Sequence, residues 1–534
     1  MDLLIWQKNQ LLLLSSIAGG WLLLFLSVVV LPIWVKRQTH LQSLYSFFQR
    51  RRTFLLLLGV LLAVFIGSYG WLVLNRHARF NSTGYDLAIH EQILWNTLHG
   101  RFFATSLEVD NSFADHFRPL MAAFLPFYAV FPTPKTLLII QVIALAVTAV
   151  PLFLLAELKL KNKSVALAIA AMYLLYPAVG FLARFDFHMG AIAVPLFMFA
   201  FLAMEKQRWK QATVWLLLAL LCKENMGIVV AMMGLYAGIM YRQWRWGAAW
   251  LLLGSGAFVF TSFWLLPTIR GETLDAMERY AWLGGNTAEI VQTLFTNPTH
   301  VWDYLVQTDR LLYLVQLSIP VGFLNFVGLP ELLIAQPFLM TNLLADHFCQ
   351  PTIYCHYHAP IIPFIFIGLV FGLARLRRWL KDERSWQFVI MLILPLAMVN
   401  FWLDNPFQNT PLVPAALDQI DNAEVVKQAL TAVPPNLSVV TTNDYAPHLA
   451  QREKLYIIGI PSQREAPTDP DIVFLNLYDQ QYIVCDGFRA YVEQLDIDAY
   501  GVTFRTGGLI VIQRDAGSNE QFRDFVLNWN NCAG

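Results

Sequence analysis

Acidic, basic and imidazole side chains occur in short clusters along this sequence, and each cluster combines groups that can exchange protons or bind phosphate. The first cluster is built around Asp86, which precedes His90 by one helical turn, so that both side chains would share a helix face. The helix dipole would keep an acid at this N-terminal position ionised, as a catalytic base requires. A simple charge complement at a helix end is the alternative interpretation.

Further clusters follow along the chain. They are Asp110, Asp115, His116 and Arg118; Arg184, Asp186 and His188; Lys223, Glu224 and Asn225; and His356, Tyr357 and His358. Ionisable groups at a membrane boundary are costly unless they pair or face a polar cavity, so their repetition predicts one shared pocket. Lys223 beside Glu224 is typical of a phosphate contact held by an ion pair, and a plain salt bridge is the alternative.

The same side chains could hold a metal ion instead. Asp186-x-His188 and His356-x-His358 supply carboxylate and imidazole ligands, but no zinc-like framework of Cys and His accompanies them. Three carboxylates are compatible with oxygen-preferring Mg²⁺ or Mn²⁺: Asp86, Asp110 and Asp115. The spacing does not require a metal. The sequence has no phosphate-binding loop, nucleophile elbow, H-E-x-x-H motif or dinucleotide fingerprint, so nucleotide chemistry of soluble enzymes is not predicted.

The composition indicates that one part of the chain lies in a membrane and another part lies in water. The chain has 534 residues, of which 57% are hydrophobic and 14% are charged, whereas an ordinary soluble domain carries about 25% charged residues. Because 37 basic and 37 acidic residues cancel, net charge predicts no nucleic-acid partner. Residues 405–534 hold 16 acids and 8 bases, which leaves 21 acids and 29 bases in residues 1–404. We therefore expect a membrane domain over 1–404 and a water-soluble domain over 405–534.

Apolar runs long enough to cross a bilayer recur through the membrane domain. They are 11–35, 54–74, 136–157, 164–182, 247–269, 311–328, 359–375 and 386–402, with weaker candidates at 190–204, 211–222, 226–241 and 330–344. Together they predict about twelve transmembrane helices. The run 117–132 is too short to cross, so we expect an interfacial or re-entrant helix there.

The distribution of basic residues indicates the orientation of these spans. They collect in alternate loops, which are 36–52, 159–163, 206–210, 242–245 and 375–384, so these loops are expected to be cytoplasmic. The outer face then receives loops 75–118 and 270–310 and the C-terminal domain. Four cysteines also fall on the outer side, where disulfides persist. We expect the pairs 349–355 and 485–532 from locality, and four free thiols are the alternative.

The C-terminal domain alternates apolar runs with helical segments. Short buried strands are expected at 436–442, 455–460 and 472–478, and helices at 418–432 and 488–495. A hairpin is expected around Thr506-Gly507-Gly508. This pattern favours a small α/β domain, to which we assign no catalytic role.

Several strings in order carry a resemblance to a known family: GYDLAIHEQILWNTLHG, DHFRPLMAAFLPFYAV, LLIIQVIALAVTAVPLFLLAEL, FDFHMGAIAVPLF, CKEN, CHYHAPIIPF and APHLAQREKLY. The sequence resembles an uncharacterised family of polytopic bacterial membrane proteins within the GT-C superfamily of integral-membrane glycosyltransferases. The resemblance implies a GT-C-like fold, a sugar donor on polyprenyl phosphate, and an acid in the first outer loop as base or metal ligand. Asp86 matches that acid by position, although many relatives have paired acids there and Asp86 stands alone.

The sequence and this resemblance together predict a glycosyltransferase of the bacterial inner membrane. It would move a hexose or pentose, with inversion, from a lipid-linked donor to an envelope glycan, lipid or protein at the extracytoplasmic face. The expected catalytic residues are Asp86, Asp115 and His116. The expected contacts to the donor phosphate are Lys223, Arg184 and Arg118. Supporting residues or metal ligands would be Asp110, Asp186, His188, Glu224, His356 and His358.

If this hypothesis is correct, a single outer pocket should bring together Asp86, His116, His188, Lys223 and His358. The rival hypothesis is a non-catalytic transporter or scaffold for an envelope lipid or polymer, but transporters usually show internal repeats and polar groups near the membrane midplane. Here the polar clusters lie at one boundary of the predicted spans.

Overall fold

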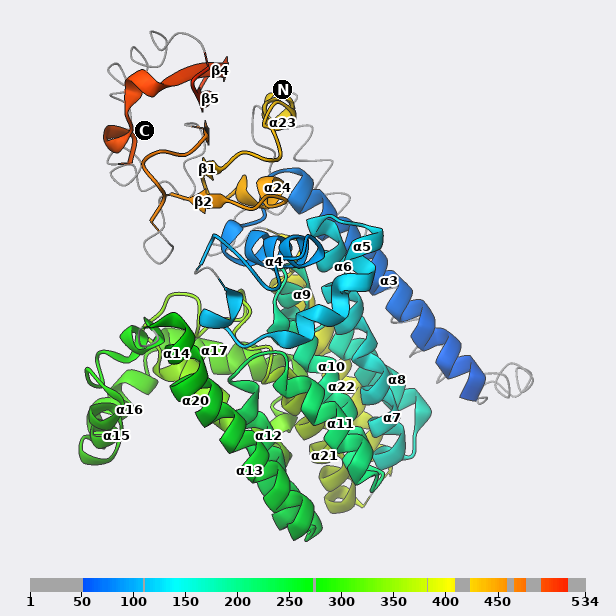
Figure 1. Ribbon diagram of the computed structural model, residues 1–534. Coiled ribbons are helices and arrows are strands. Elements are labelled where there is room, and N and C mark those ends of the chain that lie inside the picture. Colours follow the sequence, from blue (N-terminus) through cyan, green and yellow to red (C-terminus); the bar gives the residue numbers. More distant parts are fainter. Residues whose placement is uncertain are drawn as a thin grey trace, which may run out of the picture.

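A bundle of helices carries a small mixed sheet at one end (Figure 1). The computed structural model describes residues 51–108, 111–271, 275–381, 383–408, 423–458, 465–476 and 491–516. Three predictions lie outside the described residues: the span at 11–35, the role of Asp110 and the cysteine pair 485–532.

Three helical stretches in the described part of the chain are long and apolar enough to cross a membrane. They are α3 (Arg51–Ala78), the pair α6 (Pro134–Val147) and α7 (Ala149–Leu160), and the run of α13 (Trp244–Phe260), η5 (Thr261–Leu265) and α14 (Leu266–Arg270). A fourth exists if α8 (Lys163–Leu174) and α9 (Pro177–Arg184), bent by 46°, form one span. Pro177 begins α9, and the residue before a proline disfavours the helical conformation.

The expected number of about twelve spans is not confirmed. Further apolar helices account for much of the remaining bundle: α10 (Met189–Glu205), α11 (Trp209–Leu220), α12 (Met226–Tyr241), α20 (Gln336–Leu344), α21 (Ile362–Leu380) and α22 (Glu383–Leu403). The segment 117–132 contains only η4 (Pro119–Phe124) and α5 (Leu125–Val130). At about 1.5 Å per residue these two short helices cannot cross a hydrocarbon core of about 30 Å.

The continuous apolar span expected over 311–328 is broken. Helix α17 (Thr308–Ser318) ends before Pro320 in η7 (Ile319–Val321), and the chain turns through Gly322 and Phe323, which have φ values of 61° and 56°. It then resumes in α18 (Leu324–Val327), α19 (Leu329–Leu332) and η8 (Leu333–Ala335). Proline removes an amide donor from the helix, and the left-handed residues after it reverse the chain. The apolar composition alone did not reveal this break.

Small residues bring α12 and α13 into close contact. A Cβ atom added at Gly234 would lie 2.5 Å from the amide nitrogen of Leu251, and one at Gly254 would lie 2.4 Å from that of Ala231. Such small-residue contacts are the usual means by which membrane helices pack without large side chains between them. The packing fixes the start of α12, which directly follows the Lys223-Glu224-Asn225 turn.

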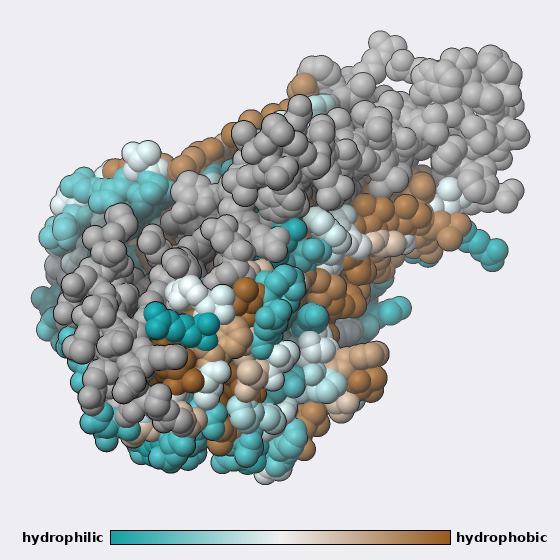
Figure 2. Space-filling view, turned by 90° about the horizontal axis from the view of Figure 1, so that it is seen from above, coloured by the Kyte–Doolittle hydropathy of each residue, from teal (hydrophilic) through white to brown (hydrophobic). Residues whose placement is uncertain are grey.

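The loop 75–118 folds into η2 (Gly84–Ala88), α4 (Ile89–Leu98) and η3 (Ser112–Ala114). The loop 270–310 contains η6 (Asp275–Tyr280), α15 (Thr287–Thr296) and α16 (Pro298–Leu305). In Figure 1, α4 lies at the same end of the bundle as the C-terminal sheet, and the turn between α12 and α13 lies at the opposite end. Seen from the sheet end, hydrophilic residues cover much of the described surface and hydrophobic residues gather on one flank (Figure 2).

The C-terminal sheet has the order β2-β1-β3-β5-β4. Its strands are β1 (Val439–Thr441), β2 (Leu455–Ile457), β3 (Ile472–Asn476), β4 (Tyr500–Thr506) and β5 (Leu509–Arg514). Strand β1 pairs in parallel with β2 and β3, and β5 is antiparallel to both β3 and β4. The predicted hairpin is confirmed, since Thr506 pairs with Leu509 around Gly507 at φ 59°. The helices include α23 (Ala423–Thr431) and α24 (Ala446–Leu449), with η9 (Ile497–Ala499) before β4.

Helix α4, which follows Asp86 and carries His90, is covered by other parts of the chain. Its polar residues Glu91 and Gln92 are fully buried. Gln92 donates to the carbonyl oxygen of Arg452 at 3.1 Å, and the side-chain amide of Gln451 donates to Glu91 at 2.8 Å. Residues of the C-terminal domain therefore pack on α4 and satisfy its buried polar groups.

Candidate functional site

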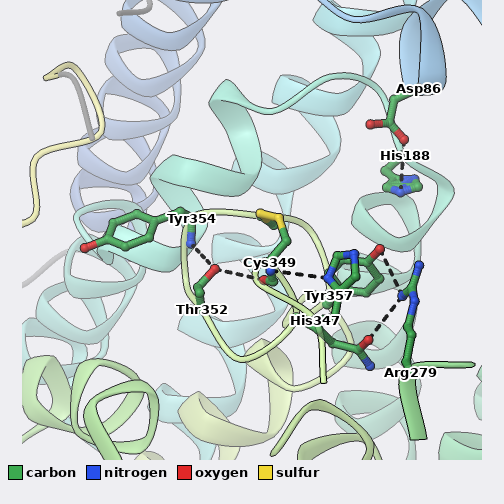
Figure 3. Close-up of a disulfide and its surroundings, with 10 residues drawn as sticks. Asp86, His188, Arg279, His347, Cys349, Thr352, Tyr354 and Tyr357 are labelled. Atoms are coloured by element: carbon green, nitrogen blue, oxygen red, sulfur yellow. Dashed lines mark hydrogen bonds and ion pairs between the residues drawn. A yellow bond between two sulfur atoms is a disulfide. The ribbon is translucent and has the colours of Figure 1, made fainter. Parts of the chain in front are cut away.

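Asp86 lies in η2, one turn before α4. Its carboxylate is 3.5 Å from Nε2 of His188, as Figure 3 shows, and its backbone oxygen is 2.6 Å from Nδ1 of His90. Burial raises the pKa of Asp86 to about 7, and the charge of Asp186 acts in the same direction. The expectation that the helix dipole keeps this acid ionised is therefore corrected: desolvation outweighs the dipole.

Two imidazoles face this carboxylate. The ring centroids of His188 and His356 are 3.4 Å apart, and the rings meet edge to face. Neither Nε2 of His188 nor Nδ1 of His356 has a hydrogen-bond partner within the described part of the chain, although both atoms are buried. Burial lowers the pKa of both rings well below the ordinary value, so each ring is neutral and offers a lone pair. Ligand atoms of these two residues and Asp86 all lie within 4.8 Å of one another.

Asp186 positions His188 rather than joining it at the site. Arg76 of α3 donates to both oxygens of Asp186, at 2.6 and 3.2 Å, and the amide and hydroxyl of Thr83 donate to one of them at 2.8 Å. Gln141 of α6 holds the next turn of chain, since its side-chain oxygen accepts from the amide of His188 at 2.7 Å. Asp186 thus connects α3, the residue before η2 and the segment that carries His188.

Two predicted site residues are placed elsewhere. Arg184 is 1% exposed and donates to the carbonyl oxygens of Pro406 and Gln408, at 3.0 and 2.6 Å. The expectation that it contacts a donor phosphate is corrected, because α9 turns its guanidinium toward residues 406–408. His358 is fully buried, with Nε2 2.8 Å from the carbonyl oxygen of Ala178. His356 is grouped with Asp86 and His188 in its place.

The guanidinium of Arg118 is also occupied by interactions with other side chains. Its Nε donates to Ser112 at 2.7 Å, its Nη2 donates to Glu108 at 2.5 Å, and its Nη1 is 3.3 Å from Nε2 of His90. The side chain is almost fully buried, so Arg118 holds the loop and His90 in place, and its predicted role as a phosphate contact is corrected. No sequence motif marks Glu108, and its only signal is its place in the same loop as Arg118.

His116 and Glu224 connect the first outer loop to the turn before α12. Nδ1 of His116 is 3.1 Å from Glu224, whose other oxygen accepts from the amide of Phe117 at 3.1 Å. Nε2 of His116 is 3.4 Å from Asp115. Burial acts to raise the pKa of Asp115, but His116 and Arg118 outweigh it and hold that pKa well below its usual range. Asp115 is therefore an ion-pair partner of His116.

Lys223 makes no hydrogen bond or ion pair with any residue that the structure describes, and it is half-buried. Its positive charge nevertheless acts to lower the pKa of Asp86, His188 and His356. Of the five residues of the predicted grouping, Asp86 and His188 are in contact, Lys223 and His116 act electrostatically on His188, and His358 lies against Ala178 instead.

An apolar cavity of about 260 Å³ lies next to this turn. Its walls come from Phe117, from Leu217 and Leu221 around the end of α11, and from Phe260 of α13, and Glu224 supplies its one carboxylate. Leu217 and Phe260 are 44% and 50% exposed, so the cavity opens on the flank of the bundle. An apolar chain could enter from the side and end beside Glu224 and Lys223.

The predicted disulfide between Cys349 and Cys355 is confirmed, and Figure 3 shows its surroundings. It closes the loop immediately before His356. Arg279, from the loop 270–310, donates to the hydroxyl of Tyr357 and to the side-chain oxygen of Gln350, both at 3.1 Å. Nothing in the sequence marked Arg279 as a neighbour of the site, because its partners lie far along the chain.

The fold and the site define a polytopic membrane protein with a carboxylate, two imidazoles and an ammonium group gathered at one end of the bundle. Residues 76–511 match the family described as predicted membrane protein (DUF2079), and the chain belongs to this family. No curated protein was found to match.

Two solved structures are similar to the chain. The crystal structure of ArnT from Cupriavidus metallidurans bound to undecaprenyl phosphate has a TM-score of 0.50 and 12% identity, covering 88% of this chain and 99% of that one. The crystal structure of ArnT from the same organism in the apo state has a TM-score of 0.45 and 13% identity, covering 87% and 98%. The first likeness confirms the expected GT-C-like fold.

Proposed function

We propose that this protein is an integral-membrane glycosyltransferase of the GT-C type that takes its sugar from a polyprenyl-phosphate-linked donor. The observation that carries the proposal is the contact of Asp86 with His188, under the electrostatic influence of Lys223, together with a lateral apolar cavity lined by Glu224, the residue next to Lys223. The fold shared with ArnT, whose structure contains undecaprenyl phosphate, supports this choice of donor.

Asp86 is the proposed base. It takes the proton from an acceptor hydroxyl while the hydroxyl oxygen forms a bond to the anomeric carbon of the sugar. The bond between that carbon and the phosphate oxygen breaks, its electron pair leaves with the lipid phosphate, and the configuration inverts. A base is most effective when its pKa is close to the working pH, and burial raises the pKa of Asp86 to about 7.

Lys223 is the proposed contact to the departing phosphate. Arg118 and Arg184 are occupied by protein acceptors, whereas the ammonium of Lys223 has no such partner among the described residues. A positive charge placed before the reaction stabilises the charge that develops on the leaving group, and a site shielded from water strengthens the effect. His116, held by Glu224 and Asp115, orients the loop opposite this turn.

The lateral cavity suits the lipid part of such a donor. Its walls are apolar, it opens on the flank of the bundle, and its carboxylate belongs to the residue next to Lys223. A polyprenyl chain lying in it would place the attached phosphate at the lysine.

A divalent ion is an alternative proposal for the same residues, in which Asp86 is a ligand and not the base, and the donor atoms fit one. Asp86, His188 and His356 would hold it, since two buried imidazole nitrogens lack partners and face one carboxylate. Two imidazoles and one carboxylate suit Mn²⁺ better than Mg²⁺, which prefers oxygen ligands. When bound, the ion would supply positive charge for the departing phosphate.

This proposal also includes an arrangement of the chain. The membrane domain over 1–404 would lie in the bacterial inner membrane, and residues 405–534 would face the extracytoplasmic side. The acceptor would be an envelope glycan, lipid or protein, and the sugar a hexose or a pentose.

The test compares a deletion strain complemented by the wild-type chain, by Asp86→Asn and by Asp303→Asn, an exposed aspartate of α16. Mass spectrometry would measure envelope glycans and lipid-linked sugars. We expect the deletion strain and Asp86→Asn to lose one glycosylated product and accumulate its lipid-linked donor, while Asp303→Asn restores the product. Full restoration by Asp86→Asn at wild-type abundance would overturn the assignment. An unchanged glycan profile in the deletion strain would favour the transporter or scaffold instead.

A further inference from the structure

We infer that the C-terminal domain helps to position the site, because its residue Asn443 holds the turn that carries Asp86. The inference rests on the proposed function for its catalytic consequence. No hydrogen bond or ion pair joins described residues of the C-terminal chain to the carboxylate of Asp86, so the effect passes through the backbone of η2.

The start of η2 has no side-chain cap from the residues next to it in sequence. Thr83 occupies the N-cap position, where a hydroxyl would normally accept from an amide of the first turn. Its hydroxyl donates to Asp186 instead. The amides of Gly84 and Tyr85 would then be among the unsatisfied donors of a helix start.

Asn443 supplies the missing acceptors from a distant part of the sequence. Its side-chain oxygen accepts from the amides of Gly84 and Tyr85, at 2.9 and 3.3 Å, and its backbone oxygen accepts from Gly84 at 2.8 Å. Asn443 is buried, so water does not compete readily for these donors. An acceptor that follows strand β1 of the C-terminal sheet therefore caps the turn of the first outer loop.

Gly84 allows the two parts of the chain to approach this closely. A Cβ atom at Gly84 would lie 2.3 Å from Cδ1 of Ile457 and 2.9 Å from Cβ of Ala446. The end of the Ile457 side chain could move, but Ala446 is fixed to the backbone of α24. Any larger residue at position 84 must therefore push the sheet away from η2.

Contacts along α4 and beyond it continue the interface. Ser106 donates to the carbonyl oxygen of Leu455 at 2.7 Å and accepts from its amide at 2.8 Å. The rings of His77 and His448 stack at 4.1 Å with an angle of 9° between their planes. With Gln92 and Glu91, these contacts hold the first outer loop against the C-terminal domain on several sides.

The consequence concerns the distance between Asp86 and His188. Asp86 belongs to the same short turn as Gly84, and its carboxylate lies 3.5 Å from His188. Without its cap, the turn is held to the His188 segment only at its first residue, through the bonds from Thr83 to Asp186, so the part that carries Asp86 can move relative to His188, whose amide is held by Gln141. A misplacement of about 1 Å at reacting groups can cost about 100-fold in rate.

The experiment uses the full chain in lipid nanodiscs and compares Asn443→Ala, Asn443→Asp and Gly84→Ala with the wild type. Asn443→Asp keeps an oxygen acceptor, and Gly84→Ala disturbs the contact from the loop side. The matched control is Asn436→Ala, an exposed asparagine of the same domain. Hydrogen exchange over residues 83–92 reports the order of the turn, exchange over β3 reports the folding of the sheet, and sugar transfer from a pool of polyprenyl-phosphate-linked sugars gives kcat and KM.

We expect Asn443→Ala and Gly84→Ala to exchange faster over 83–92 with β3 still protected. Their kcat should fall by about 10- to 100-fold at nearly unchanged KM for the lipid donor. Asn443→Asp should recover most of both losses, and Asn436→Ala should match the wild type. The inference is overturned if exchange over 83–92 stays unchanged in Asn443→Ala, or if it rises while kcat is kept.

Failure of the proposed function would look different. If the wild type transfers no sugar from any polyprenyl-phosphate donor, the transferase proposal fails. The exchange measurement then still decides whether Asn443 orders the turn: faster exchange in Asn443→Ala and Gly84→Ala alone supports it, and no change refutes it.

Discussion

Asp86 and His188 lie on different elements, yet their side chains approach to 3.5 Å because Thr83 and Asp186, their near neighbours in sequence, are hydrogen-bonded to each other. The same carboxylate of Asp186 is also bound by Arg76. One buried acid, Asp186, therefore holds the start of η2 close to the segment that carries His188.

The first prediction concerns metal binding. His188→Ala and His356→Ala should each weaken Mn²⁺ binding by at least about 10-fold, because each removes one of three grouped ligands. Isothermal titration calorimetry on the purified protein would measure this. His99→Ala, in an exposed histidine at the end of α4, is the control and should bind as the wild type does. Equal affinity in all four proteins would refute the metal site.

The second prediction concerns Lys223. Lys223→Ala should lower kcat/KM for sugar transfer by about 100-fold, because it removes the unpaired positive charge proposed to meet the leaving phosphate. Lys223→Arg should retain part of the activity, since the charge remains. The control is Lys210→Ala at the exposed start of α11. If Lys223→Ala transfers sugar as fast as Lys210→Ala does, the phosphate role is wrong.

The third prediction concerns the buried ion pair of Arg76 and Asp186, whose side chains are 6% and 1% exposed. Asp186→Ala leaves a buried guanidinium without its partner and should destabilise the fold by about 3–5 kcal/mol. The double variant Arg76→Leu, Asp186→Leu should lose less, because no unpaired charge is left. Thermal unfolding in detergent gives the comparison. A double variant less stable than Asp186→Ala would contradict this account.

The fourth prediction concerns pH and Glu91. Burial raises the pKa of Glu91 to about 7, and hydrogen bonds from Tyr128 and Gln451 only partly oppose this. A raised pKa means that the folded protein binds the proton more tightly than the unfolded chain. The resulting stability is full below the ordinary pKa of 4.5 and is lost as the pH rises through about 7.

Glu91→Gln keeps an oxygen acceptor for Tyr128 and Gln451 and cannot ionise. The wild type should therefore lose up to about 3 kcal/mol relative to this variant between pH 5 and pH 8. The Tm of both proteins over that range measures the effect. Parallel Tm curves would show that Glu91 does not titrate in this window.

Local patterns predicted the parts of the fold that depend on neighbouring residues. The hairpin around Gly507 followed from its turn residues, and the disulfide at 349–355 followed from proximity in sequence. The grouping of Asp86, His116 and Lys223 followed from placing charged clusters on one side of the membrane. Each of these inferences needed only a short window or a rule about loops.

Other features depend on how helices rotate and pack, which a single sequence does not reveal. Arg184 and His188 stand close together in one motif, but the end of α9 sends the first toward Pro406 and the second toward Asp86. His356 and His358 separate in the same way, one to the pocket and one to Ala178. The capping of η2 by Asn443 joins distant parts of the chain, so no local pattern could indicate it.

The covalent ring from Cys349 to Cys355 ends directly before His356, one of the two imidazoles opposite Asp86. Thiols stay reduced in the cytosol and join in oxidising compartments. A newly made chain would thus contain Asp86, His188 and His356 before the Cys349–Cys355 disulfide had formed. Maturation of this protein would then include an oxidation step, and the cell's thiol oxidants would act as a checkpoint on when the pocket becomes complete.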